Sequence, residues 1–480
     1  MTRFIGREKE LKTLKSVYEK KSASLVVLKG RRRIGKSRLA EEFAKHEKFY
    51  SFTGLPPTPE TTAQSQREAF AKQIKKAFNI YVDNTNDWWD LLWAVAEHTQ
   101  KDKVIILFDE ISWMGSKDPD FLGKLKTVWD NHFKKNPELV LILCGSISSW
   151  IEENILSSTG FMGRLSLILT LEELPLSDCK KFWNNEKLIS PYEKFKILAV
   201  TGGVPRYLEE IKPHLPAEEN IRQLCFEKSG ILFSEFDQIF SDLFSSRSSI
   251  YKQIVTCLGD SPADRNQIAK WLGIEVGGVI STYLDDLTKA GFISRDFSWQ
   301  IKDGKTSKLS HYRLSDNYLR FYLKYIEPNK RKIESGVFQE RTLTSLPGLS
   351  TIMGLQFENL VLSNRKLIHK LLDIRSEDII SEGPYFQRKT ARQPGCQIDY
   401  LIQTRFDCLY VCEIKFSKYD IKKDIIDVME EKILRLKMPR YFSCRPVLIH
   451  VNGISEELED SQYFSKIISF DWLLNNCYRD

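Results

Sequence analysis

The chain has 480 residues, of which 42% are hydrophobic and 28% are charged, and its formal net charge is +7. This length exceeds what one hydrophobic core supports, so we expect three or four domains of roughly 100 to 200 residues each. The composition excludes wholesale disorder, and the mild positive charge permits nucleic-acid binding without demanding it.

The apolar runs and the cysteines indicate the cellular compartment that we expect for the protein. The longest apolar runs, 104–108 and 139–144, have the length of strands and fall far short of the roughly 20 residues that cross a bilayer. The amino-terminal residues soon become charged, so no secretion signal is expected. The nine cysteines include no CxxC pair, which argues against zinc or a disulfide framework. We therefore expect a cytoplasmic protein without a membrane span.

The first motif that carries chemistry is a glycine loop at 30–37, with the sequence GRRRIGKS. It lies between a predicted buried strand at 24–28 and a helical pattern at 36–45, which is the context that a phosphate-binding loop requires. The glycines let backbone N–H groups surround phosphates, the lysine adds charge at the outer phosphates, and the serine binds magnesium. The alternative is an accidental glycine turn. The nucleotide-binding candidates here are Gly30, Ile34, Gly35, Lys36, Ser37 and Arg38.

A second buried strand, predicted at 104–108, ends in two carboxylates. Asp109 is predicted to hold the magnesium shell, and Glu110 to polarise the attacking water. Alone, these residues would be two acids in a solvated turn, but together with the glycine loop they predict a site for ATP and Mg²⁺. A third strand at 139–144 is followed by Ser146, which is either a sensor of the γ-phosphate or part of a plain turn.

Three further segments carry a family resemblance. They are FIGREKEL at 4–11, the pair Gly163-Arg164, and TGGVPRYL at 201–208. Together with the glycine loop they resemble the archaeal-type ATPases of the AAA+/STAND group. The resemblance implies a parallel P-loop sheet with flanking helices, and the alternation of buried strands and helices supports that sheet independently.

The same resemblance implies roles for individual residues. It places Phe4, Ile5 and Arg7 at the adenine end, and Pro205 in a lid against the nucleotide. It gives Arg164 a finger-like or sensor role towards the γ-phosphate, and a role in trans would imply at least a dimer. The alternatives are surface salt bridges for the two arginines and a simple helix-starting turn at the proline.

The middle of the chain has helical periodicity, and we expect a helical lid at 176–244. Three short helical patterns and a pair of strands then outline a winged helix at 245–325. Its third helix, at 279–287, carries Asp285 and Asp286 and few bases. Helices that read DNA usually present basic or amide side chains, so we favour a structural spacer or relay over DNA readout.

Near the end of the chain, acidic residues lie on two predicted neighbouring strands. Asp399 falls in the strand at 397–402, and Glu413 and Lys415 fall in the strand at 409–415. Because strand side chains alternate, Glu413 and Lys415 point to one face. Glu358, on a predicted amphipathic helix, can add a third carboxylate. Carboxylates that grip a cation, together with a lysine, are what metal-assisted phosphodiester cleavage needs.

This set resembles the PD-(D/E)XK restriction-endonuclease-like fold, and its place in the chain matches the carboxy-terminal domain of the same archaeal-type ATPases. The resemblance implies catalytic roles for Asp399, Glu413 and Lys415, with Mg²⁺ or alternatively Mn²⁺ held by Glu358, Asp399 and Glu413. The signature proline is absent, because Ile398 precedes Asp399. The alternative is an edge hairpin with exposed charges. Four residues before the first strand either contact a DNA backbone or form a basic loop; they are Gln387, Arg388, Lys389 and Arg392.

The overall expectation is an α/β multidomain protein. Its predicted parts are a P-loop AAA+ core at 1–175, the lid at 176–244, the winged helix at 245–325, a linker at 326–349, and a restriction-endonuclease-like domain at 350–480. The resemblances imply an ATPase that regulates a metal-dependent DNA endonuclease, with DNA favoured over RNA. Defence against phage or plasmids, or handling of mobile DNA, fits such a protein.

Two other functions compete with this one. The first is a nucleotide-dependent signalling or scaffold switch whose nuclease-like domain serves only as an interaction module. The intact charges of Asp399, Glu413 and Lys415 argue against it. The second is a motor that remodels DNA through the winged helix, which the acidic third helix disfavours.

Overall fold

The computed structural model describes residues 3–115, 117–146, 148–183, 188–244, 248–338, 342–391 and 393–475. The chain divides into two compact units. The amino-terminal unit consists of Met1–Glu172, Ile239–Ser248 and Lys289–Gly291, and the carboxy-terminal unit consists of Glu173–Gln238, Ser249–Thr288 and Phe292–Asp480. In the described part of the chain, no helix combines the length and the apolar character needed to cross a bilayer.

The amino-terminal unit is built on a five-stranded sheet in the order β2-β3-β4-β1-β5. All neighbouring strands in it run parallel. Because helices cover both faces of such a sheet, its central strands read as continuous apolar runs. The predicted parallel sheet with flanking helices is therefore confirmed. The strands are β1 (Ser24–Gly30), β2 (Lys48–Thr53), β3 (Val104–Asp109), β4 (Leu139–Gly145) and β5 (Leu165–Leu171).

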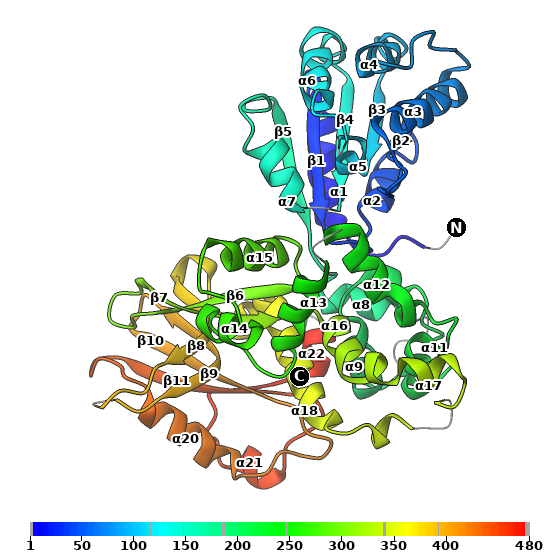
Figure 1. The fold of residues 1–480 in the computed structure, drawn as a ribbon. Coiled ribbons are helices and arrows are strands. Elements are labelled where there is room, and N and C mark those ends of the chain that lie inside the picture. The colour runs from blue at the N-terminus through cyan, green and yellow to red at the C-terminus, as the bar shows by residue number, and fades with distance from the viewer. Residues whose placement is uncertain are drawn as a thin grey trace. The chain divides into compact units, whose positions relative to one another are not determined.

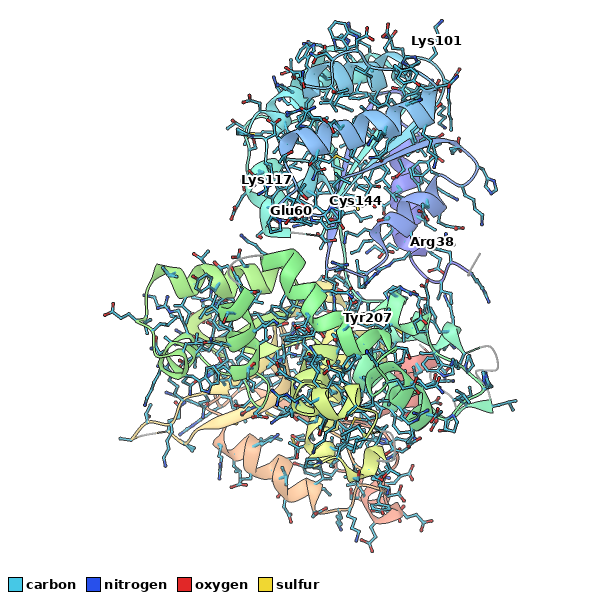
Figure 2. All side chains as sticks on the ribbon, turned by 45° about the vertical axis from the view of Figure 1, so that its right-hand side comes forward. Arg38, Glu60, Lys101, Lys117, Cys144 and Tyr207 are labelled. Carbon is cyan, nitrogen blue, oxygen red and sulfur yellow. The ribbon has the colours of Figure 1, made fainter. Side chains whose placement is uncertain are left out.

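Alternate residues of β1 enter two different cores, one on each face of this sheet. Val26 and Leu28 pack with the helices that follow the amino terminus and the glycine loop, and Leu25 and Val27 pack with the remaining helices. Cys144 lies inside this unit, whereas Lys101 and Lys117 lie on its surface (Figure 2). The helices are α1 (Glu8–Tyr18), α2 (Lys36–Phe43), α3 (Ala63–Phe78), α4 (Trp88–Glu97), α5 (Ile111–Gly115), α6 (Phe121–Asn131) and α7 (Ser148–Ile151).

Residues 176–244 are largely helical, as the sequence predicts for this segment. Ser190 caps α9 by accepting a hydrogen bond from the backbone N–H of Glu193, and Pro191 takes the first helical position, where its missing N–H costs nothing. The helices are α8 (Leu176–Cys179), α9 (Pro191–Thr201), α10 (Pro205–Leu208), α11 (Ala217–Cys225) and α12 (Ile231–Phe244).

Three helices and an antiparallel strand pair follow, in the order predicted for a winged helix. Asp264 and Gln267 form a reciprocal capping box at the start of the second helix. The elements are α13 (Ser248–Cys257), α14 (Arg265–Leu272), α15 (Gly278–Lys289), β6 (Ile293–Trp299) and β7 (Thr306–Leu314). We call β6, β7 and the turn between them the wing.

The carboxy-terminal unit contains a second five-stranded sheet, in the order β12-β11-β10-β9-β8. Figure 1 labels β8, β9, β10 and β11 of this sheet. It is mixed, since β8, β9 and β10 are antiparallel neighbours and β10, β11 and β12 are parallel. The strands are β8 (Ile379–Gln387), β9 (Cys396–Thr404), β10 (Cys408–Lys415), β11 (Ser443–His450) and β12 (Lys466–Ser469). The helices of this region are α16 (Asn317–Phe321), α17 (Lys330–Glu334), α18 (Leu349–Ser363), α19 (Arg365–Leu371), α20 (Ile425–Arg435), α21 (Glu456–Asp460) and α22 (Phe470–Asn475).

The wing and this mixed sheet share one hydrophobic core. Trp299 and Ile301 are buried within the apolar cluster of the sheet. The indole N–H of Trp299 donates to Oε1 of Gln403 at 2.7 Å, and Nε2 of Gln403 donates to the carbonyl of Ile301 at 2.7 Å. Ser298 Oγ donates to the carbonyl of Phe386 at 2.7 Å and accepts from its N–H at 3.0 Å. This end of the wing is thus packed onto β8 and β9.

Candidate functional site

The glycine loop and the end of β3 meet in the amino-terminal unit. Ser37, at the start of α2, donates a 2.7 Å hydrogen bond from its Oγ to Oδ2 of Asp109, although 72 residues separate the two. Both lie at carboxyl ends of parallel strands or directly after them, and such ends meet at one edge of the sheet. A hydroxyl and a carboxylate oxygen side by side are hard donors of the kind that Mg²⁺ prefers.

Lys36 lies buried within the loop that it follows. Its Nζ donates to the carbonyls of Gly30 and Arg31 at 3.1 and 3.0 Å, and to Oγ of Ser146 at 2.9 Å. Ser146 Oγ in turn donates to Oε1 of Glu110 at 2.8 Å. One serine hydroxyl therefore joins the phosphate-binding lysine to the glutamate that is predicted to polarise water.

Two glycines are required by the backbone of this loop. Gly35 has φ 88°, in the left-handed region, where side chains bring strain. Gly30 has φ 147°, and a Cβ there would lie 2.5 Å from the carbonyl oxygen of Leu171. The loop can therefore adopt this path only with glycine at both positions, and Gly35 leads directly into the N-terminus of α2.

Arg7 connects the amino-terminal segment 4–11 to the glycine loop through hydrogen bonds. Its Nη2 donates to the carbonyl of Ile34 at 3.2 Å and also to the carbonyl of Glu172, and its Nη1 lies 3.1 Å from Oε1 of Glu10. Phe4 packs on the core beside α1 and α2, and Ile5 is half-buried. The contacts of Arg7 position the loop, and the adenine end stays a prediction for these three residues.

Two other predicted residues of this unit bond to residues outside this cluster of contacts. Arg38 projects from α2 (Figure 2) and pairs with Glu41 at 3.4 Å. Arg164 binds Asp130 through two hydrogen bonds, from Nε at 2.9 Å and from Nη2 at 2.8 Å. The hydrogen bond from Arg164 is the main reason that the pKa of Asp130 is lowered. This is the salt bridge that stood as the alternative for Arg164, and the finger role stays a prediction.

Pro205 begins α10 in the carboxy-terminal unit. The turn before it is tightly packed, since a Cβ on Gly203 would lie 2.4 Å from the carbonyl oxygen of Leu174. The Gly203 N–H also donates to Oε2 of Glu173 at 2.8 Å. These contacts explain the glycine at position 203, and a place against the nucleotide stays a prediction for Pro205.

The second candidate site lies on the mixed sheet. The antiparallel register pairs Cys412 with Tyr400, so Glu413 and Asp399 follow as neighbours on one face. Lys432, from α20, donates from its Nζ to Oδ1 of Asp399 at 3.3 Å and to Oε2 of Glu413. Asp399 Oδ2 also accepts the backbone N–H of Ile414 at 3.0 Å. The two predicted carboxylates therefore converge on one ammonium group.

Glu358, on α18, belongs to the same electrostatic cluster. Burial raises its pKa to about 7, and the charge of Asp399 adds to the increase. The pKa of Glu413 is likewise raised to about 7, by burial and then by Asp399, against the opposing effect of Lys432. Such shifts mark negative charges that are crowded together in a poorly solvated place. Among the described residues, however, no three His, Cys, Asp or Glu side chains are arranged as a metal-binding group.

The lysine nearest the carboxylates is not the one that the motif predicts. Lys415 ends β10 with an exposed side chain, although its charge still lowers the pKa of Glu413. Burial lowers the pKa of Lys432, but Asp399 and Glu413 outweigh burial and raise it. The sequence held a signal for Lys432, because it continues the buried stripe of α20 that includes Met429. A lysine within an apolar stripe indicates a buried partner.

One comparison with known proteins locates a match in the amino-terminal part of the chain. Residues 4–211 match a family model described as an ATPase domain predominantly from Archaea. An uncharacterized protein of Methanocaldococcus jannaschii, MJECL04, is 26% identical over 339 residues, which cover 70% of this chain and 71% of that protein.

The chain is also similar to several solved structures. The Walker-type ATPase PABY2304 of Pyrococcus abyssi matches with a TM-score of 0.48 and 16% identity, covering 67% of this chain and 96% of that one. The ORC2 protein of Aeropyrum pernix, in ADPNP and ADP complexes, matches with a TM-score of 0.42 and 13% identity, covering 70% and 97%. The family match, together with the parallel sheet and the glycine loop, supports an archaeal-type P-loop ATPase domain with ATP as its ligand in this part of the chain.

Proposed function

We propose that this protein is an ATP-dependent switch that controls a metal-dependent DNA endonuclease in its carboxy-terminal unit. The ATPase half is supported by the family match over residues 4–211. The observation that carries the nuclease half is the convergence of Asp399 and Glu413 on Lys432. In this proposal the protein is cytoplasmic and acts on DNA, in defence or in the handling of mobile DNA.

In the nucleotide site, each residue has a role that follows from its contacts. Ser37 and Asp109 would hold Mg²⁺ between their oxygens, where the ion neutralises charge on the phosphates. Lys36 would exchange its bonds to loop carbonyls for the outer phosphates. Glu110 would leave Ser146 Oγ and orient the attacking water. Ser146 thus keeps the lysine and the glutamate in place until the nucleotide arrives.

In the carboxylate site, Asp399, Glu413 and Glu358 would hold Mg²⁺ or Mn²⁺. The raised pKa values of the two glutamates fit this group, because a divalent cation relieves the crowding of negative charge that raises them. Such an ion would supply Lewis-acid stabilisation to a scissile phosphate. Lys432 would neutralise the departing or attacking oxygen from within the site, and Lys415 would contact the phosphate from its rim.

The arrangement of elements also favours a restriction-endonuclease-like domain. The chain order α18, α19, β8, β9, β10, α20, β11 places two helices before three antiparallel strands, and a crossover helix before a parallel strand. The crossover puts α20 across the face that carries Asp399 and Glu413, so the helix and the strands build the site together. This fits the resemblance that the motif suggests.

One observation favours the scaffold switch as a second candidate. The Lys432 ammonium already pairs with both Asp399 and Glu413, and the described residues contain no ready three-ligand metal group. A domain that keeps its fold without cutting would also look this way. The two functions differ in whether a divalent cation competes with Lys432.

A cleavage assay tests the proposal and separates the two candidates. The full chain is incubated with plasmid, single-stranded DNA and RNA, with Mg²⁺ or Mn²⁺, and with and without ATP. Asp399→Asn removes one charge from the site, and Asp407→Asn is its control, because Asp407 is exposed in the adjacent turn and its φ of 51° suits asparagine. Lys36→Ala tests control by ATP.

We expect metal-dependent cutting of DNA that Asp399→Asn abolishes, that Asp407→Asn leaves unchanged, and that loses its response to ATP in Lys36→Ala. ATP hydrolysis without cutting of any substrate would reject the nuclease and favour the scaffold switch. Cutting that survives Asp399→Asn would place the chemistry elsewhere.

A further inference from the structure

An open groove of about 550 Å³ lies beside the carboxylate site, within the carboxy-terminal unit. Its walls come from β7 of the wing, from the ends of β8 and β9, and from α20. Lys432 lines this groove and also contacts both Asp399 and Glu413. Whatever occupies the groove therefore reaches the carboxylates through that lysine.

Two arginines make the groove a place for phosphate groups. Arg388 is 68% exposed, and its Nη2 lies 3.8 Å from Oδ2 of Asp264. Arg435 pairs with Glu431 one turn earlier on α20. Exposed pairs of this kind contribute little, so both guanidinium groups can exchange their partners for phosphate oxygens, which they bind in bidentate fashion. Arg392, predicted with Arg388 as a backbone contact, lies outside the described residues.

An aromatic pair forms another part of the wall. The rings of His311 and Phe386 lie with centroids 4.1 Å apart and planes at 32°. Burial lowers the pKa of His311, so the imidazole is neutral near pH 7 and offers a ring face in place of a charge. The Nδ1 atom of His311 is buried and has no hydrogen-bond partner.

The wall between these features is held rigidly by Gln387. Its Nε2 donates to the carbonyls of Pro394 at 2.9 Å and Arg435 at 2.6 Å, and its Oε1 accepts the N–H of Lys437 at 2.8 Å. The hydrogen-bonding atoms of this side chain are thereby engaged with the protein. The amide fixes the end of β8 against the end of α20, so the arginines and the ring pair keep their spacing.

We propose that this groove binds a single-stranded segment of DNA and guides it to the carboxylates, so that the substrate is DNA with unpaired nucleotides. This inference rests on the nuclease function proposed above. A basic groove with aromatic faces is the usual design for unpaired strands, since phosphates pair with arginines and bases stack on rings. The volume lies in the range of roughly 300 to 1,000 Å³ that holds one small ligand, which suits one or two nucleotides.

Binding measured without cleavage tests the groove separately from the nuclease. The full chain in EDTA is titrated against a fluorescent single-stranded oligonucleotide and against the duplex of the same sequence, by fluorescence anisotropy at several salt concentrations. We compare Arg388→Ala/Arg435→Ala with Arg375→Ala/Arg445→Ala. The control removes two exposed arginines of the same unit that do not line the groove.

We expect the single strand to bind more tightly than the duplex. The groove variant should weaken single-strand binding roughly 10-fold or more and reduce the salt slope by about 0.7 for each lost phosphate contact, and the control variant should bind as the wild type does. Phe386→Leu should cost roughly 5- to 100-fold through lost stacking. A thermal melt of each variant checks that the fold is kept.

Three results would overturn the inference: equal or tighter binding of the duplex, no binding of the single strand, or groove variants that bind like the control. The nuclease function is tested by a different measurement, the cleavage assay described above. A protein that binds the strand through these side chains but never cuts would reject the nuclease and keep the groove. A protein that cuts DNA while the groove variants bind normally would keep the nuclease and reject the groove.

Discussion

The two candidate sites of this molecule are assembled in different ways. The nucleotide site combines a short glycine loop with the end of one strand, and its parts lie at neighbouring strand ends of a parallel sheet. The carboxylate site draws on α18, β9, β10 and α20, and its central cation, Lys432, arrives on a helix that no motif marks. A site at strand ends is set by local backbone geometry, whereas a site on a sheet face depends on everything packed around that sheet.

The largest expected effect is a loss of stability in the unit that holds the carboxylate site, caused by a substitution outside that site. Trp299→Ala removes the buried indole that joins the wing to Gln403, and core Trp→Ala changes cost about 3 to 5 kcal/mol. We expect the free energy of unfolding of the carboxy-terminal unit to fall by this amount, measured by denaturant titration. ATP binding should persist, because Trp299 belongs to the other unit.

The control for that change lies two residues earlier on the same strand. Phe297 is 41% exposed, so Phe297→Ala should alter the free energy of unfolding by about 1 kcal/mol or less. Equal effects of the two substitutions would show that the wing is not buried against the sheet.

Next in size is the loss of the loop lysine. Lys36→Ala should lower ATP turnover by about 10² to 10³-fold, the cost of removing one group that stabilises transition-state charge. Phosphate release reports the rate. Lys45→Ala is the matched control, since Lys45 lies just beyond the end of α2 and pairs with Glu42 at the surface. If both variants turned over ATP normally, the loop would not be the nucleotide site.

The two lysines of the carboxylate site offer a sharper comparison. Lys432→Met should reduce cleavage roughly 10- to 100-fold, as is usual when a group supporting a metal site is lost, and Lys415→Met should reduce it less. Mg²⁺ should also raise the melting temperature of Lys432→Met more than that of the wild type, because the cation then replaces the missing ammonium. Identical Mg²⁺ shifts in the wild type and both variants would argue against a metal between these carboxylates.

The smallest effect is expected at Arg164. Because its guanidinium is engaged by Asp130 in two hydrogen bonds, Arg164→Ala should change ATP turnover by less than about threefold, where loss of an arginine finger costs about 10³-fold or more. Asp130→Asn, which keeps the shape of the partner, is the companion variant. A thousandfold loss in Arg164→Ala alone would restore the finger role and imply a subunit that supplies it in trans.

Much of the nucleotide site could be predicted from the sequence. Gly30, Lys36 and Ser37 form a contiguous motif, and apolar runs identify the strands that place them. Asp109 could be assigned to the same edge because parallel strand ends meet there. Asp399 could be placed within reach of Glu413 because the two predicted strands are neighbours joined by a polar turn.

Other features could not be predicted, because they depend on contacts between segments far apart in the chain. Lys432 reaches Glu413 only through the packing of α20 on the sheet, although its place in an apolar stripe was a signal that could have been followed. Trp299 looks like an ordinary end of a wing strand, and only the fold shows that it enters the core of β8 and β9. Periodicity identifies which face of a helix or strand is buried, but it does not identify the element that packs against that face.

The shared core of the wing and the mixed sheet decides where the chain can be divided. A truncated protein ending at residue 349 would keep Trp299 and Ile301 and lose the strands that cover them. The apolar surface exposed in this way would favour aggregation. A fragment beginning at residue 350 would keep the mixed sheet but lack the indole of Trp299, which packs in the core of that sheet. Gene fusions, domain exchanges and crystallisation fragments should therefore keep the wing and the mixed sheet on one polypeptide.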